Sequence, residues 1–290
     1  MALEIRGKTA LITGGASGIG LELSRRLLQE GCSVVIADLK LGSEAEQLVK
    51  TSNDGASASF IETDVTNWTQ LQNSFDHAVK KFGHLDMVFP AAGIFEPPGY
   101  SNFWDLNQGA DTVNASSFKI FDINITHPVR ATQLAIDYFT RQKLNHGVVV
   151  LFSSIAAQLP LLPTPLYSAS KHAISGFIRC LGHLEPTINV RVNGVAPGLV
   201  KTPIWTDDKL KWVDENVDEW VTTKQVVETI IDLITNKDHV GGTILEVGAD
   251  RVRPVTELND PGPDGKGHTV QGLGTAFASV YDQIGKNFGK

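Results

Sequence analysis

The first 90 residues alternate between short apolar runs and amphipathic stretches. Residues 9–13 (TALIT) and 33–37 (SVVIA) are nearly continuous apolar runs of strand length, whereas residues 19–29 repeat apolar side chains at helical spacing. Apolar strands between amphipathic helices are typical of a parallel sheet that is covered on both faces. The same pattern predicts strands at residues 59–62, 85–89, 148–152, 190–195 and 243–246, and helices at residues 43–50, 67–82, 117–142 and 167–181.

The predicted fold class is α/β, a single-domain Rossmann fold with a doubly wound parallel sheet and helices on both faces. The alternation continues to about residue 247 without a linker or repeat, so we assign residues 1–250 to one domain. Residues 251–290 contain a Gly/Pro-rich run that cannot continue a helix or strand. We expect them to form an extension with one short helix at residues 276–284. Residues 96–115, rich in Gly, Asn and Asp, predict a surface loop.

Composition and charge narrow the classes of partner. The 290 residues are 42% hydrophobic and 20% charged, which is ordinary for a globular protein with a sizeable core. The net charge of −7 argues against nucleic acid, because binding to a phosphate backbone depends on basic residues. Cys32 and Cys180 are too few for a disulfide framework. We find neither a signal peptide nor a membrane span in the sequence, and expect a cytoplasmic protein with no membrane partner and no metal site.

A glycine-rich turn, residues 13–20 (TGGASGIG), joins the first strand to the first helix. Glycines here permit a tight turn and let the backbone approach a pyrophosphate at the helix N-terminus. By itself, the pattern is equally consistent with a turn that only needs positive φ. Asp38 ends the second strand eighteen residues after Gly20, close to the spacing of a ribose-binding acid. Its carboxylate would accept bonds from ribose hydroxyls and repel a 2′-phosphate, which favours NAD over NADP.

Tyr167 and Lys171 are four residues apart, so in a helix they share one face. A phenol with a pKa of about 10 is a poor base at neutral pH. A neighbouring ammonium stabilises the phenolate, and a shift of about 3 units requires about 4 kcal/mol of differential interaction. This spacing often arises by chance, so its interpretation depends on the other motifs.

Together these motifs resemble the short-chain dehydrogenase/reductase family. The matching positions between about residues 4 and 247 are residues 13–20, Asp38, Ala92-Gly93, Asn124, Ser153-Ser154, Tyr167, Lys171 and Pro197-Gly198. The resemblance implies a nicotinamide cofactor and hydride transfer. It makes Tyr167 the general acid/base and Ser154 the donor to the reacting oxygen. It also implies that Lys171 lowers the tyrosine pKa and binds the nicotinamide ribose, and that Asn124 anchors a proton-relaying water.

The resemblance also implies a set of NAD-binding residues. They are Gly14, Ser17, Gly18, Ile19, Asp38, Asp64, Val65, Ala92, Gly93, Tyr167, Lys171, Pro197, Val200 and Thr202. Asp64 and Val65 are expected near the adenine, although an Asp at a strand end is as often a helix cap. Thr202 and the backbone of Val200 are expected at the nicotinamide carboxamide.

Two segments depart from the family pattern. Pro90-Ala91 replace the usual pair of asparagines, which mainly stabilise the central sheet in the family, so we expect altered local support there. Gly248-Ala249-Asp250 replaces the usual Asp-Gly-Gly after the last strand. The C-terminal extension is therefore expected to follow its own path, over the active site or along a subunit interface.

Three segments at the carboxyl ends of strands are candidates for substrate recognition: residues 96–104, 155–166 and 204–220. The second is apolar with three prolines, and the third, which we call the lid segment, contains Trp205, Trp212 and Trp220. This lining favours a hydrophobic or aromatic alcohol, but tryptophans that simply pack a lid explain it equally well. Within the family, the chain most resembles the 15-hydroxyprostaglandin dehydrogenase group. That likeness implies NAD-dependent oxidation of a secondary alcohol to a ketone.

Two alternatives stay open at this point. One is an NAD(P)H-dependent ketoreductase of secondary metabolism, and the other is a non-catalytic NAD-binding regulatory protein, because a fold does not determine a function. The presence of both Tyr167 and Lys171 favours an enzyme. The resemblance also implies a homodimer or homotetramer that associates through residues 117–142 and 167–181.

Overall fold

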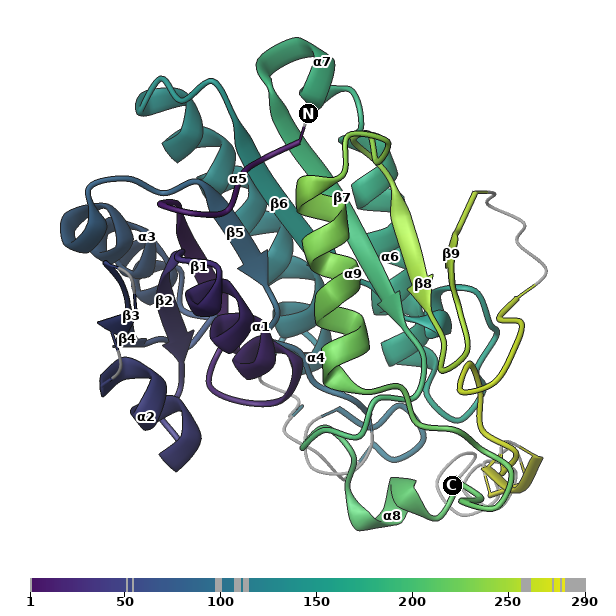
Figure 1. Ribbon diagram of the computed structural model, residues 1–290. Coiled ribbons are helices and arrows are strands. Elements are labelled where there is room, and N and C mark those ends of the chain that lie inside the picture. Colours follow the sequence, from purple (N-terminus) through teal and green to yellow (C-terminus); the bar gives the residue numbers. More distant parts are fainter. Residues whose placement is uncertain are drawn as a thin grey trace.

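The sheet topology confirms the predicted fold class. The structure, a computed structural model, describes residues 2–50, 52–53, 55–96, 101–106, 111, 115–256, 262–272, 274–276 and 278–279. Within these residues, nine strands form one sheet in the order β3-β4-β2-β1-β5-β6-β7-β8-β9 (Figure 1). The strands from β4 to β8 in this order pair in parallel, and β3 and β9 pair antiparallel at the two edges. The chain order reverses at β1 and β5, which is where ligands bind in open α/β sheets.

All seven predicted strands are present in the parallel part, with ends that differ by at most three residues. They are β1 (Thr9–Thr13), β2 (Ser33–Asp38), β4 (Ala56–Glu62), β5 (Met87–Pro90), β6 (Gly147–Phe152), β7 (Val190–Pro197) and β8 (Ile244–Val247). The edge strands β3 (Ser52–Asn53) and β9 (Val252–Pro254) were not predicted. Because β9 pairs with β8, the sheet continues beyond the predicted domain boundary at residue 250.

Helices cover both faces of the sheet. The helices α1 (Gly18–Gln29), α2 (Ser43–Lys50) and α9 (Thr223–Thr235) pack on one face, and α3 (Trp68–Phe82), α5 (His127–Arg141) and α6 (Pro165–Cys180) pack on the other (Figure 1). Along β1, Ala10 and Ile12 belong to the first buried cluster and Leu11 to the second. Both faces of the strand are thus buried, which explains its continuous apolar sequence.

The predicted helix at residues 117–142 contains a π-helical turn. It consists of α4 (Lys119–Phe121), the π-helical η1 (Asp122–Thr126) and α5. Such turns occur frequently at functional sites, and this one contains Asn124. Four helical segments were missed in the sequence: η2 (Ile155–Ala157), α7 (Leu184–Ile188), α8 (Asp207–Leu210) and α9.

After β9, the chain returns to the carboxyl end of the sheet. Residues 262–272, which we call the tail segment, bond to the loops after β7 and β8. The amide of Leu199 donates to the carbonyl of Gly267 at 3.0 Å, and that of Ala249 donates to the carbonyl of Lys266 at 2.9 Å. Of the helix predicted at residues 276–284, positions 276, 278 and 279 are helical and the others lie outside the described residues. The described parts of the predicted loop 96–115 have no regular secondary structure.

Candidate active site

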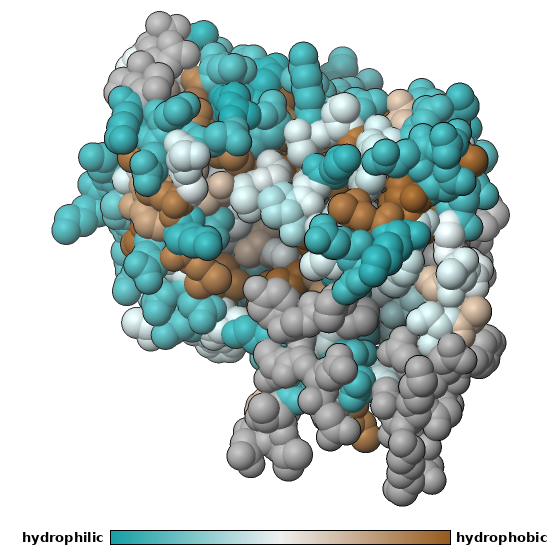
Figure 2. All heavy atoms as spheres, turned by 90° about the horizontal axis from the view of Figure 1, so that it is seen from below, coloured by the Kyte–Doolittle hydropathy of each residue, from teal (hydrophilic) through white to brown (hydrophobic). Residues whose placement is uncertain are grey.

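Two hollows open at the carboxyl ends of the parallel strands. Figure 2 views this end of the molecule, where apolar and weakly polar residues gather inside a hydrophilic rim. The larger hollow is a cleft of about 1780 Å³ beside β1 and β5, and the smaller is an apolar pocket of about 640 Å³. Phe95, Ser154, Tyr167 and Ile204 line both. Molecules bound in the two hollows would therefore meet at Ser154 and Tyr167.

The glycine turn is packed too closely for side chains. A Cβ on Gly14, whose φ is +64°, would lie 2.7 Å from the Cα of Ala92, and one on Gly20 would lie 2.2 Å from the carbonyl oxygen of Gly14. Gly18 has a φ of +52° and packs against Thr202. The glycines thus bring the turn against the loops after β5 and β7, with the N-terminus of α1 at the cleft.

Asp38 is held at the end of β2 by two backbone amides. Its Oδ2 accepts from Ala16 at 3.0 Å and its Oδ1 accepts from Leu39 at 2.8 Å. A carboxylate has about four acceptor positions, so further positions can receive hydroxyl donors. Asp38 lines the cleft together with the glycine turn.

Asp64 and Val65 also line the cleft. The Oδ1 of Asp64 accepts from the amide and the hydroxyl of Thr66 at 2.9 and 2.7 Å. Burial favours a higher pKa for Asp64, but the bonds from Thr66 and the charge of Lys119 outweigh it, so its pKa lies below the ordinary value. The cap of α3 is Asn67, which accepts from the amides at positions 69 and 70. The helix-cap reading of Asp64 is therefore wrong.

Two polar side chains of α6 and one from the end of β6 lie close together at the cleft, and two of them, Ser154 and Tyr167, also line the apolar pocket. Tyr167 lies in the first turn of α6, which begins two residues earlier than predicted. Lys171 lies one turn later, with its Nζ 5.4 Å from the centroid of the Tyr167 ring, and donates to the carbonyl of Phe152 at 2.8 Å. Ser154 is the N-cap residue of η2, and its Oγ accepts from the amide of Ala156 at 3.2 Å.

Burial dominates the titration of the tyrosine and the lysine. It raises the pKa of Tyr167 to about 12, while hydrogen bonding with Ser154 acts in the opposite direction. Burial lowers the pKa of Lys171 to about 8, so this ammonium is still mostly charged at neutral pH. The lowering of the Tyr167 pKa by Lys171 stays a prediction.

Asn124 connects the loop after β5 to α6. It is 2% exposed and lies in the π-helical turn. Its Oδ1 accepts from the amide of Ile94 and its Nδ2 donates to the Ile94 carbonyl, both at 2.9 Å; the Nδ2 also donates to the Oγ of Ser170 at 3.2 Å. The side chain thus fixes the backbone next to Gly93, and the expected water relay stays a prediction.

A threonine–histidine pair lies beside the loop that has lost the usual asparagines. The Nδ1 of His127 is 3.1 Å from the carbonyl of Ile123, so this nitrogen carries the proton. The Nε2 then accepts from the hydroxyl of Thr13 at 3.0 Å. Burial lowers the pKa of His127 to about 4, which keeps the ring neutral. The Oγ1 of Thr13 also accepts from the amide of Ala92 at 3.5 Å, so this pair supports the loop after β5.

Comparison with known proteins decides the family. The family described as short chain dehydrogenase matches residues 8–213, most of the chain. The chain belongs to the short-chain dehydrogenase family. It is 36% identical over 210 residues to short-chain dehydrogenase reductase 3a of Arabidopsis thaliana, which covers 71% of this chain and 76% of that protein. It is 29% identical over 234 residues to 15-hydroxyprostaglandin dehydrogenase [NAD(+)] of Homo sapiens, with coverage of 79% and 80%.

A solved structure shows the same fold. The 3-ketoacyl-(acyl-carrier-protein) reductase from Brucella melitensis, complexed with NADH, aligns with this chain at a TM-score of 0.69 and 23% identity. The alignment covers 85% of this chain and 99% of that one.

In this short-chain dehydrogenase, the fold gathers the predicted site residues around one cleft. Asn124 lies directly behind it, with its Oδ1 3.5 Å from the position of a Cβ on Gly93. The predicted residues that line the cleft are Gly14, Ser17, Gly18, Ile19, Asp38, Asp64, Val65, Ala92, Gly93, Ser154, Tyr167, Lys171, Pro197, Val200 and Thr202.

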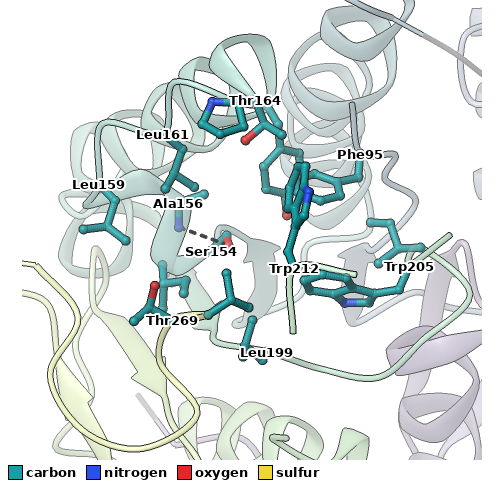
Figure 3. A pocket seen from close by; sticks show the side chains of 15 residues that line it. Phe95, Ser154, Ala156, Leu159, Leu161, Thr164, Leu199, Trp205, Trp212 and Thr269 are labelled. Atoms are coloured by element: carbon teal, nitrogen blue, oxygen red, sulfur yellow. Dashed lines mark hydrogen bonds between the residues drawn. The ribbon is translucent and has the colours of Figure 1, made fainter. Parts of the chain in front are cut away.

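The apolar pocket includes residues that the sequence analysis missed. The predicted segments 155–166 and 204–220 supply Leu159, Leu161, Trp205 and Trp212, but Thr269 and Val270 of the tail segment also line it (Figure 3). Phe95 lies outside the predicted segments, whereas Glu96 and Lys209 lie within segments 96–104 and 204–220 but were not singled out. Phe95 and Lys209 line the cleft, and Glu96 bonds to the amide of Tyr167. These three residues lie next to the predicted motifs in the sequence, but no motif or spacing of their own marks them as site residues.

The only signal for the tail segment was the unusual Gly248-Ala249-Asp250. A Cβ on Gly248 would lie 1.5 Å from the Nε2 of His268. This glycine therefore makes room for the buried His268 ring, whose Nδ1 pairs with the Oε1 of Glu246. The extension was expected over the active site or along a subunit interface, and the presence of Thr269 and Val270 in the apolar pocket favours the first alternative.

The described residues contain neither a membrane-spanning helix nor a metal cluster. Among them, we find no helix with both the length and the apolar character that a membrane crossing requires. No group of three or more His, Cys, Asp or Glu side chains in this part of the chain is arranged to hold a metal ion.

Proposed function

We propose that this short-chain dehydrogenase oxidises a secondary alcohol of a hydrophobic small molecule to a ketone, with NAD as the cofactor. The observation that carries the proposal is the position of Ser154 and Tyr167, which line both the cleft and the apolar pocket. The names of two similar proteins support the cofactor: 15-hydroxyprostaglandin dehydrogenase [NAD(+)], and the reductase complexed with NADH.

The cleft residues fit a dinucleotide. The N-terminus of α1 offers backbone N–H groups and a partial positive charge for phosphates, and the glycine turn leaves that end open. Asp38 offers acceptor positions to ribose hydroxyls and would repel a 2′-phosphate. Lys171, Thr202 and the backbone at Val200 would hold the nicotinamide end. When bound, NAD supplies the hydride acceptor.

The residues between the cleft and the apolar pocket then accept the hydroxyl proton and stabilise the charge that its removal creates. Tyr167 takes the hydroxyl proton of the alcohol, and Lys171 stabilises the phenolate with its charge. Because the Oγ of Ser154 already accepts from Ala156, its own O–H can donate to the reacting oxygen. A donor aimed at an oxygen where charge develops stabilises the transition state more than the ground state. The leucines and tryptophans of the pocket exclude water and select an apolar substrate.

The test is a screen of aromatic, steroid and terpenoid secondary alcohols with NAD and with NADP, followed by the absorbance of the reduced cofactor. Tyr167→Phe should lower kcat by about 10²- to 10⁴-fold while NAD binding stays nearly intact. Tyr138→Phe is the matched control, because Tyr138 is buried in α5 and bonds to Asp76 and Gln72 away from the site.

The outcomes separate the alternatives. Turnover of ketones with NADPH alone would favour the ketoreductase, and NAD binding without turnover of any alcohol or ketone would favour the regulatory protein. A Tyr167→Phe variant that retains the wild-type rate would contradict the proposed acid/base. We also expect a cytoplasmic homodimer or homotetramer that associates through α5 and α6; a monomer in light scattering would contradict the oligomer.

A further inference from the structure

Glu96 binds the first turn of the helix that carries Tyr167. Its side chain is fully buried, and its Oε2 accepts from the backbone amide of Tyr167 at 2.6 Å. The first N–H groups of a helix have no partner within the helix. Thr164, at the N-cap of α6, makes no capping hydrogen bond with its side chain. A carboxylate 71 residues away in sequence therefore holds this turn.

Lys209 contacts Phe95, the residue that precedes Glu96. It belongs to α8 of the lid segment, is only 3% exposed and lines the cleft. Its Nζ is 3.4 Å from the carbonyl oxygen of Phe95 and 4.4 Å from the centroid of the Phe95 ring. A buried ammonium is costly unless polar groups compensate it. The carbonyl, the aromatic face and the charge of Glu96 provide this compensation.

Phe95 links both charged residues to the reacting end. Its ring packs edge-on against Tyr167 with a centroid distance of 4.4 Å. It also lies 5.9 Å from the ring of Trp205 and 6.4 Å from that of Trp212. A displacement of α8 would therefore move a ring that touches Tyr167.

The charges of Glu96 and Lys209 support one another. Burial raises the pKa of Glu96 to about 7, against the amides of Tyr167, Phe103 and Leu166 and the charge of Lys209. Burial lowers the pKa of Lys209 to about 8, against the charge of Glu96. The groups that bear on the Glu96 carboxylate are thus Lys209 from α8 and the amides of α6 and of the loop at Phe103. Between about pH 7 and pH 8, both side chains are charged.

We propose that Glu96 and Lys209 act as a positioning pair for the reaction proposed above, on which this inference rests. The carboxylate fixes the first turn of α6, and hence Tyr167, and its charge holds Lys209 and α8 against Phe95 at the cleft. Neither side chain is required to touch the reacting atoms. The pair makes the geometry of Tyr167 depend on the placement of the lid segment.

The variants Glu96→Gln, Lys209→Met and their double combination test this pairing. Glutamine keeps an acceptor for the Tyr167 amide but removes the charge. We expect each single variant to lower kcat about 10-fold with a KM for NAD within twofold of wild type, and the double variant to be no slower than the slower single. Lys209→Arg should recover most of the rate. Lys50→Met and Glu46→Gln, which remove either side of an exposed ion pair in α2, are matched controls with wild-type kinetics.

The dependence of kcat on pH distinguishes the charge of Glu96 from a role as a helix cap alone, because a cap without a charge would leave this dependence unchanged. In the wild type, protonation of Glu96 adds to the fall of kcat between pH 8 and pH 6. This contribution should be missing in Glu96→Gln, so its profile should be shallower. A profile parallel to that of the wild type, or rate losses that simply add in the double variant, would overturn the pairing.

Hydrogen exchange tests the placement of α8 without any turnover. The amides of Lys209 and Leu210 both donate to the carbonyl of Thr206 at 3.0 Å. After correction for intrinsic rates, both should exchange faster in Glu96→Gln and Lys209→Met, whereas α9 should not change. Unchanged exchange would overturn the inference even in an active enzyme. If the wild type oxidises no alcohol but exchange responds as expected, the proposed function fails while the contact between α8 and Glu96 stands.

Discussion

The side chain of Asn124 pairs with both backbone groups of Ile94, each at 2.9 Å. The side-chain amide thus accepts from one backbone group and donates to the other, as a paired residue in a neighbouring β-strand would do. It joins the loop at Gly93, which lines the cleft, to Ser170 of α6. The position of Gly93 relative to α6, the helix that carries Tyr167 and Lys171, therefore depends on one buried amide.

Replacement of Asn124 by leucine should reduce both stability and turnover. The amide and carbonyl of Ile94 would lose their partner, at a cost of about 1–3 kcal/mol in the free energy of unfolding. The rate of the proposed reaction should fall as well, because the loop beside the cleft is released. Urea denaturation and initial rates measure the two effects. Thr132→Val, which removes a buried hydroxyl bonded only within α5, is the control and should keep its rate.

Substitution of Asp38 should change the choice of cofactor. In Asp38→Ala, the ribose hydroxyls would lose a charged acceptor, and NAD binding should weaken roughly 10- to 150-fold. Asp38→Asn keeps an acceptor for the Ala16 amide but no longer repels a 2′-phosphate. Its ratio of NADP to NAD turnover should therefore rise. Titration calorimetry and steady-state rates give both quantities, and an unchanged NAD affinity in Asp38→Ala would contradict the assignment.

The buried Lys171 should make stability rise with pH. Its pKa is lowered from 10.5 to about 8 in the folded protein, so above pH 8 the unfolded state binds more protons and the folded state gains stability. The penalty is present in full below pH 8 and is relieved toward pH 10.5. Relative to Lys171→Met, the wild type should gain about 2 kcal/mol in the free energy of unfolding between pH 7 and pH 9.5.

The control for this measurement is Lys211→Met, because Lys211 is exposed. The difference between wild type and this variant should stay constant over the same pH range. Equal pH dependence of wild type and Lys171→Met would show that the lysine is not buried in its charged form.

Alanine at position 248 should displace the tail segment. The new Cβ would overlap the ring of His268, since the two positions are 1.5 Å apart. Thr269 and Val270 would then leave the apolar pocket, and the KM for an apolar alcohol should rise roughly 5- to 10-fold, the effect of losing one or two buried methyl contacts. The KM for NAD should stay unchanged. Exchange of the amides of residues 262–272 should become faster.

The double variant Gly248→Ala/His268→Ala distinguishes this clash from a general defect. Without the ring, the added methyl group has room, so the double variant should behave like His268→Ala alone. Additive effects of the two substitutions would show that Gly248 matters for another reason.

Much of the scaffold was readable from local pattern. Strands buried on both faces need continuous apolar sequences, and this requirement marked the parallel strands other than β4, which is buried only at Ala56 and Ala58. The α9 helix was readable too: Thr222 and Gln225 form a capping box, followed by apolar residues at helical spacing, but this signal was overlooked. By contrast, β3 and β9 have two and three residues, and only their partner strands make them strands. The π-helical turn likewise has no local marker, because it depends on what Asn124 meets in the fold.

The chain by itself determined the family, the glycine turn, the acid after the second strand and the tyrosine and lysine one helical turn apart, because each depends on neighbours close in sequence. Only the tertiary structure decided that Glu96 holds the amide of Tyr167, that Lys209 lies over Phe95 and that the tail segment lines the apolar pocket. The first two contacts join residues 71 and 114 positions apart. Packing of the whole sheet brings these distant residues together, and no periodicity or local spacing in the sequence predicts such contacts.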